Sequence, residues 1–158
     1  MERALRKYLA GGVFENVAPK SSRNLSAVRG RNNRSTELCL RLALVRARLR
    51  GWKLHAHGLP GNPDFVFLRR RLAVFVDGCF WHGCPDCGHV PKTNTSFWRA
   101  KIRRNIQRDR KSNEELRKRN FRVARLWEHE LQSDVRKCVM RISAMLRQKR
   151  KKRSLAIL

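Results

Sequence analysis

Three cysteines lie close together in one short segment and could bind a metal ion. Cys79, Cys84 and Cys87 follow the spacing C-x4-C-x2-C, which lets three thiolates reach one zinc ion. A structural zinc site is closed and tetrahedral, so it needs a fourth ligand. The candidates for that ligand are His82, His89, Cys138 and His129. His129 is the best placed, because it follows the end of a predicted strand. The alternative is that the three cysteines are ordinary reduced thiols.

Two aspartates stand at the ends of predicted strands and could hold a second kind of metal ion. Asp64 follows Pro63 and opens one strand, and Asp77 ends the next. Carboxylates at adjacent strand ends can share a Mg²⁺ ion, which prefers oxygen ligands. Hydrolysis of a phosphodiester uses such an ion to polarise the phosphate. The alternative interpretation of Asp64 is a turn aspartate after proline.

The elements that must position these residues predict a mixed α/β fold. We expect helices over 36–50, 95–119 and 133–147, and strands over 52–57, 64–68, 72–77 and 121–127. The first helix has a candidate buried face formed by Leu38, Leu42, Val45 and Leu49, following the helical period. The order αβββαβα indicates a central mixed sheet with helices on both faces.

Charge dominates the composition and points to a nucleic-acid partner. The 158 residues include 38 Lys and Arg against 12 Asp and Glu, a formal net charge of +26. Such an excess opposes compaction unless a polyanion neutralises it. A hydrophobic fraction of 41% is enough for one compact core. No stretch approaches the roughly 20 apolar residues of a membrane span, and no signal peptide is evident. We therefore expect a cytoplasmic protein with reduced cysteines.

Three regions are expected along the chain. They are a basic N-terminal arm over 1–34, a folded domain over 35–147 and a basic C-terminal tail over 148–158. The polar composition of the arm is also that of a disordered tail. The charge run from Lys149 to Arg153 is expected to add phosphate contacts that do not depend on sequence.

Three motifs follow one another along the chain: LPGNPDF (59–65), VFVDGCFWH (74–82) and KTNTSFW (92–98). Together they resemble the very short patch repair (Vsr) DNA mismatch endonucleases, bacterial enzymes that nick DNA beside a thymine–guanine mismatch. With RLWEH (125–129), the similar region covers roughly residues 21–131. The resemblance implies a restriction-endonuclease-like fold of the PD-(D/E)xK type, with a mixed central sheet flanked by helices and a structural zinc site. It also implies Mg²⁺-dependent nicking of double-stranded DNA.

The resemblance assigns four positions to the chemistry. Asp64 matches the carboxylate that binds the catalytic Mg²⁺, and Val76 matches the residue whose backbone carbonyl assists it. His82 matches a histidine near the attacking water, and Glu37 matches an acidic residue that supports the centre. Asp77 stands where the best-known member has a histidine, so the proton donor to the leaving group stays open.

The resemblance also assigns metal and DNA contacts. The zinc ligands would be Cys79, Cys84, Cys87 and His129. Aromatic residues that wedge into the base stack would be Phe80, Trp81 and Trp98, and polar residues that meet the mispaired bases would be Lys101 and Asn105. Leu25 and Val28 of the arm would intercalate from the minor groove. For the aromatic residues the alternative is core packing, although we expect Phe80 and Trp81 to point opposite ways in an extended loop.

The sequence therefore predicts a zinc-stabilised, Mg²⁺-dependent nicking endonuclease for thymine–guanine mismatches. We expect a monomer at the bacterial nucleoid, with other repair proteins as further candidate partners. One alternative is a defence or restriction-type nuclease of the same fold with a different DNA target. Another is a non-catalytic, zinc-stapled DNA-binding module. Asp64, His82 and Glu37 argue against that last alternative, because simple binding requires none of them.

Overall fold

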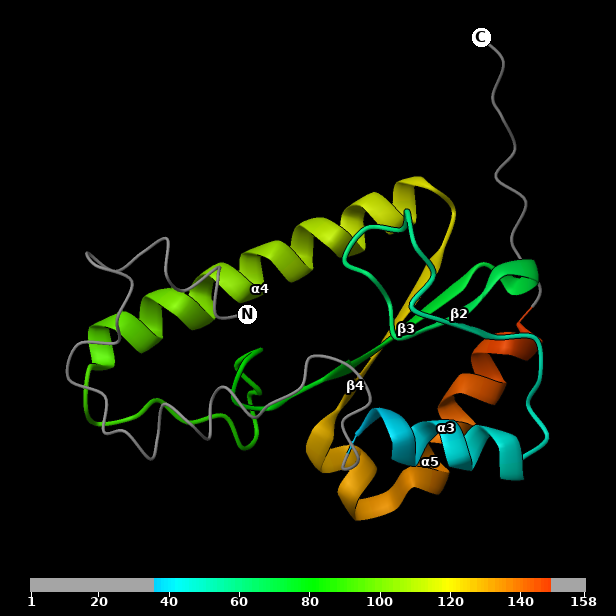
Figure 1. The fold of residues 1–158 in the computed structure, drawn as a ribbon, viewed down its shortest axis with the longest axis horizontal. Coiled ribbons are helices and arrows are strands. Elements are labelled where there is room, and N and C mark those ends of the chain that lie inside the picture. Colours follow the sequence, from blue (N-terminus) through cyan, green and yellow to red (C-terminus); the bar gives the residue numbers. More distant parts are fainter. Residues whose placement is uncertain (1–35, 149–158) are drawn as a thin grey trace, which may run out of the picture.

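The computed structural model describes residues 36–148. These residues form one four-stranded sheet, which Figure 1 shows together with its helices. The elements are α3 (Glu37–Arg46), β1 (Lys53–Leu54), β2 (Phe65–Phe67), β3 (Leu72–Asp77), α4 (Thr95–Lys118), β4 (Arg122–Trp127) and α5 (Glu128–Arg147). A single 3-10 turn, Leu68–Arg70, links β2 to β3. These elements follow the predicted order. The predicted arm over 1–34 and residues 149–158 of the predicted tail lie outside the described residues.

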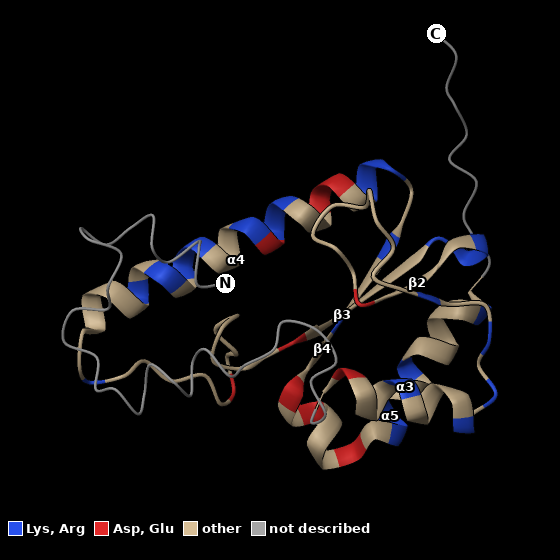
Figure 2. Cartoon of the chain, in the orientation of Figure 1, with Lys and Arg blue, Asp and Glu red and all other residues tan. Residues whose placement is uncertain are grey.

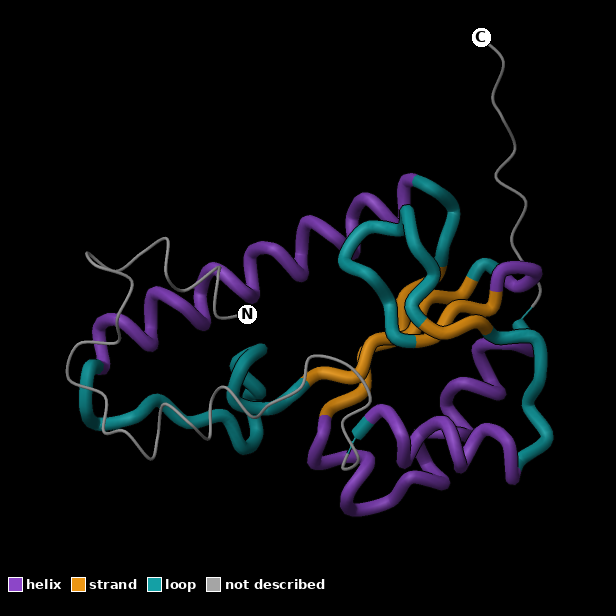
Figure 3. Tube along the Cα trace, viewed as in Figure 1, coloured by secondary structure: helices purple, strands orange, loops and turns teal. Residues whose placement is uncertain are grey.

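The sheet is mixed, as predicted. In the spatial order β1-β2-β3-β4, the first three strands pair antiparallel, and β3 pairs with β4 in parallel. The parallel register runs from Leu72 opposite Arg122 to Asp77 opposite Trp127. A parallel pair requires a long crossover, which residues 78–94 and α4 provide. Both strands consequently end at the same edge of the sheet, where the sequence places most of its candidate functional residues (Figure 3).

Helices cover both faces of the sheet. On one face, α3 and α5 pack against residues that include Leu72, Val74 and Leu126. On the other face, Leu116 of α4 packs with a second group that includes Phe75. Alternation along β3 produces this division, because successive side chains of a strand point to opposite faces.

The predicted buried face of the first helix is wrong at Leu42 and Val45, although Leu49 does pack against the core. Leu40 and Leu44 are fully buried, whereas Leu42 and Val45 are 49% and 58% exposed. Leucines at alternate positions fit more than one helical face, and packing against α5 decides which face is buried. The helix also ends before the predicted residue 50, because Arg48 adopts a left-handed backbone with φ 55°.

The last helix begins at Glu128, earlier than the predicted residue 133. Its first turn is closed by Glu130, whose carboxylate accepts a hydrogen bond of 2.7 Å from the backbone N–H of Trp127. The helix is then interrupted at Asp134, which has φ −155° and ψ 86°. The Asp134 carboxylate accepts hydrogen bonds from the backbone N–H groups of Arg136 and Lys137, so it caps the second segment. The sequence pattern therefore identified only this second segment.

Charged residues are unevenly distributed over the described part of the chain (Figure 2). Nine of the 24 residues of α4 are Lys or Arg, whereas the first turn of α5 contains Glu128 and Glu130. Helix α4 thus presents a long basic surface of the kind that contacts phosphates. None of the helices between residues 36 and 148 is long and apolar enough to cross a membrane.

Candidate active site and metal clusters

The three loop cysteines and His129 converge on one point. The Nδ1 atom of His129 lies 3.3 Å from the Sγ atoms of Cys79 and Cys87, and 3.5 Å from that of Cys84. The Sγ atoms of Cys84 and Cys87 are 3.6 Å apart. Of the four candidate fourth ligands, His129 is therefore the one that the structure places beside the cysteines.

The donor atoms are spaced as a tetrahedral zinc site requires. With usual bond lengths, an ideal site separates nitrogen from sulfur by about 3.6 Å and two sulfurs by about 3.8 Å. The four donors also lie within 4.8 Å of one another. Asp86, which the sequence analysis did not identify, has its Oδ2 atom 3.7 Å from the other ring nitrogen of His129. At this distance the two groups form a charge contact and no hydrogen bond. This cluster can hold a zinc ion.

The cluster joins the two parallel strands at their ends. Cys79 comes two residues after Asp77, the last residue of β3, and His129 comes two residues after Trp127, the last residue of β4. Tight turns bring the other cysteines back, with Cys84 N–H donating to the Cys79 carbonyl at 2.9 Å. Burial opposes ionisation of Cys84, but hydrogen bonds from the backbone N–H groups of Cys87 and Asp86 lower its thiol pKa. A lowered pKa favours the thiolate that binds metal.

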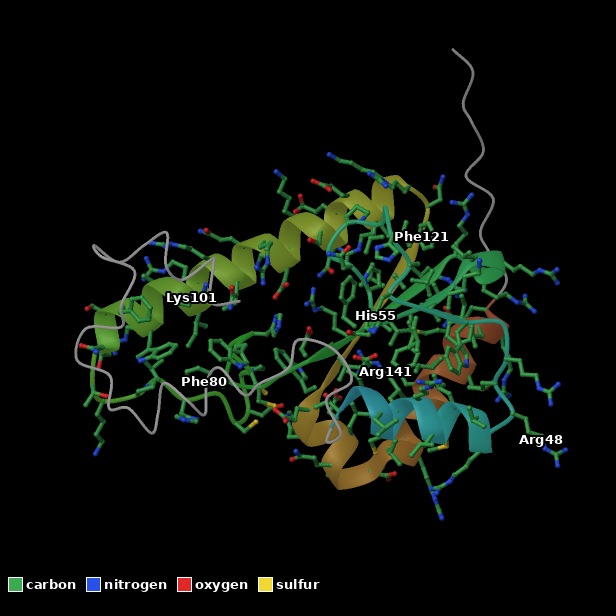
Figure 4. All side chains as sticks on the ribbon, viewed as in Figure 1. Arg48, His55, Phe80, Lys101, Phe121 and Arg141 are labelled. Carbon is green, nitrogen blue, oxygen red and sulfur yellow. The ribbon has the colours of Figure 1, made fainter. Side chains whose placement is uncertain are left out.

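A second cluster surrounds Asp64 near the middle of the molecule. Ligand atoms of Glu37, His55 and Asp64 lie within 4.8 Å of one another, and Figure 4 labels His55 in this region. Asp64 Oδ2 accepts a hydrogen bond of 2.7 Å from the backbone N–H of Val76. The structure therefore brings Asp64, Glu37 and the Val76 backbone together. It adds His55, which the sequence analysis did not identify.

The Asp64 carboxylate is held in a setting that disfavours its charge. Burial, together with the charges of Glu37 and Asp77, raises its pKa from 3.8 to about 6, although the Val76 hydrogen bond and His55 act in the opposite direction. Two carboxylates kept close together in a buried site repel each other and attract a cation. The donor set of Asp64 and Glu37 therefore fits a divalent metal ion.

His82 is anchored by a carboxylate on the neighbouring helix. Its Nδ1 atom lies 2.5 Å from Oδ2 of Asp109, which belongs to α4. Although burial acts against it, the hydrogen bond from His82 lowers the pKa of Asp109, and nearby arginines add to this effect. The ionised Asp109 thus fixes the orientation of the imidazole. Asp109 was not identified from the sequence, because only the fold brings α4 beside the loop that carries His82.

Asp77 has a different environment from the one the sequence predicts. It is only 2% exposed, and its two carboxylate oxygens accept hydrogen bonds of 2.5 and 2.7 Å from Arg125. His82 Nδ1 is 3.8 Å away. We expected Asp64 and Asp77 to share one metal ion. In the structure, the cluster of possible ligands around Asp64 contains Glu37 and His55 and does not include Asp77. Arg125 of β4 was not identified from sequence, since alternation alone does not distinguish it from a surface arginine.

The candidate wedge residues form one aromatic cluster. Ring centroids of Phe80 and Trp81 are 5.0 Å apart, and Trp98 lies 5.2 and 6.0 Å from them. Phe80 and Trp81 are partly exposed, whereas Trp98 is only 7% exposed. The expectation that Phe80 and Trp81 point opposite ways is wrong, because the loop is folded into turns and the two rings meet edge to face. Trp98 packs beneath them as a support.

The polar candidates on α4 differ in their surroundings. Asn105 is buried and donates a hydrogen bond of 2.8 Å to the Trp81 carbonyl, so in this structure it holds the loop in place. Lys101 is half-buried, and burial together with Arg108 and Arg104 lowers its pKa. Phe80 and Lys101 lie at the same end of the molecule, away from Phe121 (Figure 4). Leu25 and Val28 are outside the described residues.

Comparison with known proteins gives a consistent result. The family model described as DNA mismatch endonuclease Vsr matches residues 16–88. The type II nicking enzyme V.NaeI of Lentzea aerocolonigenes is 46% identical over 113 residues, which cover 69% of this chain and 68% of that protein.

Two further relatives extend the comparison. The type II nicking enzyme V.XorIIP of Xanthomonas oryzae pv. oryzae is 39% identical over 122 residues, covering 75% of this chain and 88% of that protein. The DNA mismatch endonuclease Vsr of Escherichia coli is 37% identical over 110 residues, covering 68% of each chain.

Proposed function

The chain belongs to the Vsr DNA mismatch endonuclease family, and we propose that it nicks one strand of duplex DNA at thymine–guanine mismatches to begin short-patch repair. Membership makes it an endonuclease and hence a hydrolase, with DNA as its partner. The observation that carries the proposal is a pair of converging carboxylates, the half-buried Asp64 beside β2 and the buried Glu37 of α3, together with the His82–Asp109 pair. A chain that only bound DNA would not need either arrangement.

The residues present fit a catalytic Mg²⁺ ion. Asp64 and Glu37 would hold it, and the Val76 backbone fixes the Asp64 carboxylate through its N–H group. A carbonyl contribution from Val76, as in the family, remains part of the proposal. When bound, the ion supplies positive charge that polarises the scissile phosphate and supports the leaving oxygen.

His82 is proposed as the general base. Because Asp109 engages Nδ1, the ring presents Nε2 to a water molecule, and an imidazole can accept a proton near neutral pH. Asp109 stabilises the imidazolium that results. Arg125 balances the charge of Asp109, to which it lies at 3.2 Å. Asp77 has both carboxylate oxygens hydrogen-bonded to Arg125, so it would act by positioning Arg125 beside Asp109.

The Cys79, Cys84, Cys87 and His129 cluster is proposed to hold structural zinc within a restriction-endonuclease-like fold. Zinc would fix the loop that carries Phe80, Trp81 and His82 without touching the substrate. Aromatic rings can insert at a base step, and a mismatched step unstacks at lower cost than a matched one. Lys101 would meet the DNA beside this cluster. Asn105 would contact the DNA only after its hydrogen bond to the Trp81 carbonyl breaks.

We extend the proposal to the whole chain. The boundaries 1–34 for a basic arm, 35–147 for the nuclease domain and 148–158 for a basic tail are kept, with Leu25 and Val28 as minor-groove contacts of the arm. A chromosomal substrate implies action at the bacterial nucleoid. We propose that the protein acts as a monomer, and that other repair proteins take over the nick.

A second function has specific support. Two of the similar proteins are named type II nicking enzymes, which favours a role beside a restriction system and a target defined by flanking sequence. This alternative uses the same chemistry on a different DNA feature. A non-catalytic module is the least favoured reading, for the reason given above.

One experiment separates these possibilities. Labelled duplexes carrying a thymine–guanine mismatch, another mismatch or full pairing are incubated with the zinc-loaded protein, with or without Mg²⁺, and the products are resolved on a denaturing gel. We expect Mg²⁺-dependent nicking of the thymine–guanine duplex alone, in one strand. Equal nicking of matched DNA would support the restriction-type alternative, and no nicking of any duplex would refute both enzymatic proposals.

A further inference from the structure

The cluster around Asp64 combines three different elements and two kinds of donor. Glu37 comes from the first turn of α3, His55 directly follows β1, and Asp64 directly precedes β2. Their ligand atoms lie within 4.8 Å of one another. Two oxygen donors and one nitrogen donor thus meet at one point. A centre that used only Mg²⁺ would gain little from the nitrogen, because Mg²⁺ prefers oxygen ligands.

The backbone holds His55 in an uncommon conformation. Its φ is 43°, in the left-handed region, which costs free energy for a residue with a side chain. The backbone N–H of His55 donates to the Asp64 carbonyl at 3.1 Å, so the β1–β2 pairing maintains this conformation. The result is that the imidazole is directed toward Glu37, whose Oε1 atom lies 2.8 Å from His55 Nε2.

The contact between His55 and Glu37 is close but poorly aligned. Although the two atoms are within hydrogen-bonding distance, His55 Nε2 is buried and has no hydrogen bond of acceptable geometry within the described part of the chain. A histidine whose role was only to orient Glu37 would be expected to donate a well-aligned hydrogen bond. Two donor atoms that converge on the same space are instead typical of ligands that share an ion.

We propose that His55 is a third ligand of the divalent cation centre, and that the centre therefore binds transition-metal dications, with Mn²⁺ as the test case, more tightly than Mg²⁺. This inference rests on the proposed function and specifies the metal preference of the same site. Its physical basis is the affinity of imidazole for first-row transition metals, which Mg²⁺ does not share.

The test uses DNA-free protein with zinc already bound, so that the Cys79, Cys84, Cys87 and His129 cluster cannot take up the added metal. Mn²⁺ binding is followed by electron paramagnetic resonance, and Mg²⁺ affinity is obtained by competition. Pulsed measurements detect magnetic coupling between bound Mn²⁺ and a ¹⁴N nucleus. The variant is His55→Asn, because asparagine tolerates a left-handed backbone and removes the imidazole. His57→Asn is the matched control, since His57 is exposed and only two residues away.

The parent protein is expected to bind Mn²⁺ about tenfold or more tightly than Mg²⁺, with a clear ¹⁴N coupling. His55→Asn should lose the coupling and lower the affinity for Mn²⁺ more than that for Mg²⁺, whereas His57→Asn should change neither. Equal affinities in the parent, or a coupling that persists in His55→Asn, would overturn the proposal. If His55→Asn does not fold, His55→Gly provides the same comparison with a residue that adopts positive φ freely.

Nicking is measured in parallel on the thymine–guanine duplex, and the two proposals fail separately. Mn²⁺ coupling to nitrogen without nicking would refute the proposed function and leave the ligand set in place. Nicking without nitrogen coupling would refute the role of His55 alone.

Discussion

Arg125 donates hydrogen bonds of 2.5 and 2.7 Å to the two carboxylate oxygens of Asp77, and the same guanidinium lies 3.2 Å from the Asp109 carboxylate. It also sits over the ring of Phe75 at 4.7 Å. Although burial acts against its charge, the hydrogen bonds with Asp77 raise the pKa of Arg125. The guanidinium therefore stays charged and links the end of β3 to the carboxylate that anchors His82.

Removing this guanidinium should destabilise the fold. Arg125→Met leaves Asp77 buried without a counter-charge, and breaking a buried pair in this way costs roughly 3–5 kcal/mol. Urea unfolding measures the loss. The double variant Asp77→Asn/Arg125→Met should recover part of that free energy but not the nicking activity. A single variant as stable as the parent would contradict this account of the pair.

Asp109→Asn should slow nicking by roughly 100-fold or more, because it removes the carboxylate that orients His82 and general-base catalysis contributes about 10²–10⁴-fold. DNA affinity and zinc content should stay close to those of the parent. Single-turnover nicking at saturating protein isolates the chemical step. Glu114→Gln, an exposed acidic position on the same helix, is the control and should nick normally. Comparable slowing in both variants would assign the effect to the charge of α4.

Asp64→Asn should abolish nicking and also change how stability depends on pH. The pKa of Asp64 is raised to about 6 in the folded protein, so the folded state binds more protons than the unfolded state between about pH 4 and 6. This contribution to stability is present at low pH and is lost as pH rises through about 6. Above that pH, the ionised carboxylate costs roughly 2–3 kcal/mol.

The asparagine variant should therefore be more stable than the parent at pH 8, and the difference should shrink toward pH 5. Urea unfolding of the zinc-loaded protein without added Mg²⁺ measures it. A difference that does not change with pH would mean that the surroundings of Asp64 do not disfavour its charge.

Cys84→Ser should lose bound zinc and much of the stability of the fold, since structural zinc contributes its binding free energy to folding. Metal analysis after gel filtration and a thermal melt report the two effects. Cys39→Ser, on α3 and outside the cluster, should retain zinc. A parent protein that contains no zinc after expression with the metal present would sink the zinc assignment.

We expect two members of the aromatic cluster to have different roles, with Trp98 stabilising the fold and Phe80 contacting the DNA. Trp98→Ala removes a buried ring and should cost about 3–5 kcal/mol of folding free energy. Phe80→Ala should instead leave the melting temperature close to that of the parent and lower nicking of mismatched DNA more than overall binding, because stacking contributes roughly 1–3 kcal/mol per base. An equal loss of thermal stability in both variants would make Phe80 a core residue.

Residues with local patterns were predictable from the sequence. The cysteine spacing and the position of His129 predicted the metal cluster, because ligands near strand ends can be located from the strands alone. The order and type of the described elements also followed from periodicity and turn residues. The buried face of α3 did not, since Leu40 and Leu42 fit different helical faces equally well and the packing partner decides between them.

Partners that come from distant elements were not predictable. Arg125 and Asp77 are adjacent only because β3 and β4 pair in parallel, and Asp109 reaches His82 only because α4 packs beside the loop. His55 offered a weak signal, because it is a histidine at the end of a short strand before Asp64. The direction of its ring depends on a left-handed backbone conformation, which the residue type does not predict. Tertiary pairing therefore determined what sequence reasoning missed.

The loop and α4 form a single crossover between β3 and β4, which leaves the parallel register after Asp77 at one end and returns at the other end, where Arg122 pairs with Leu72. Gly83, with φ 63°, seats the loop so closely on α4 that an added Cβ atom would lie 2.8 Å from Ile102. Residues 85–94 are under less constraint, because most are exposed and Cys87 is the only metal-cluster member among them. Residues 89–94 therefore have room to change in length while the strand register and the seating of Gly88 on Cys84 are kept.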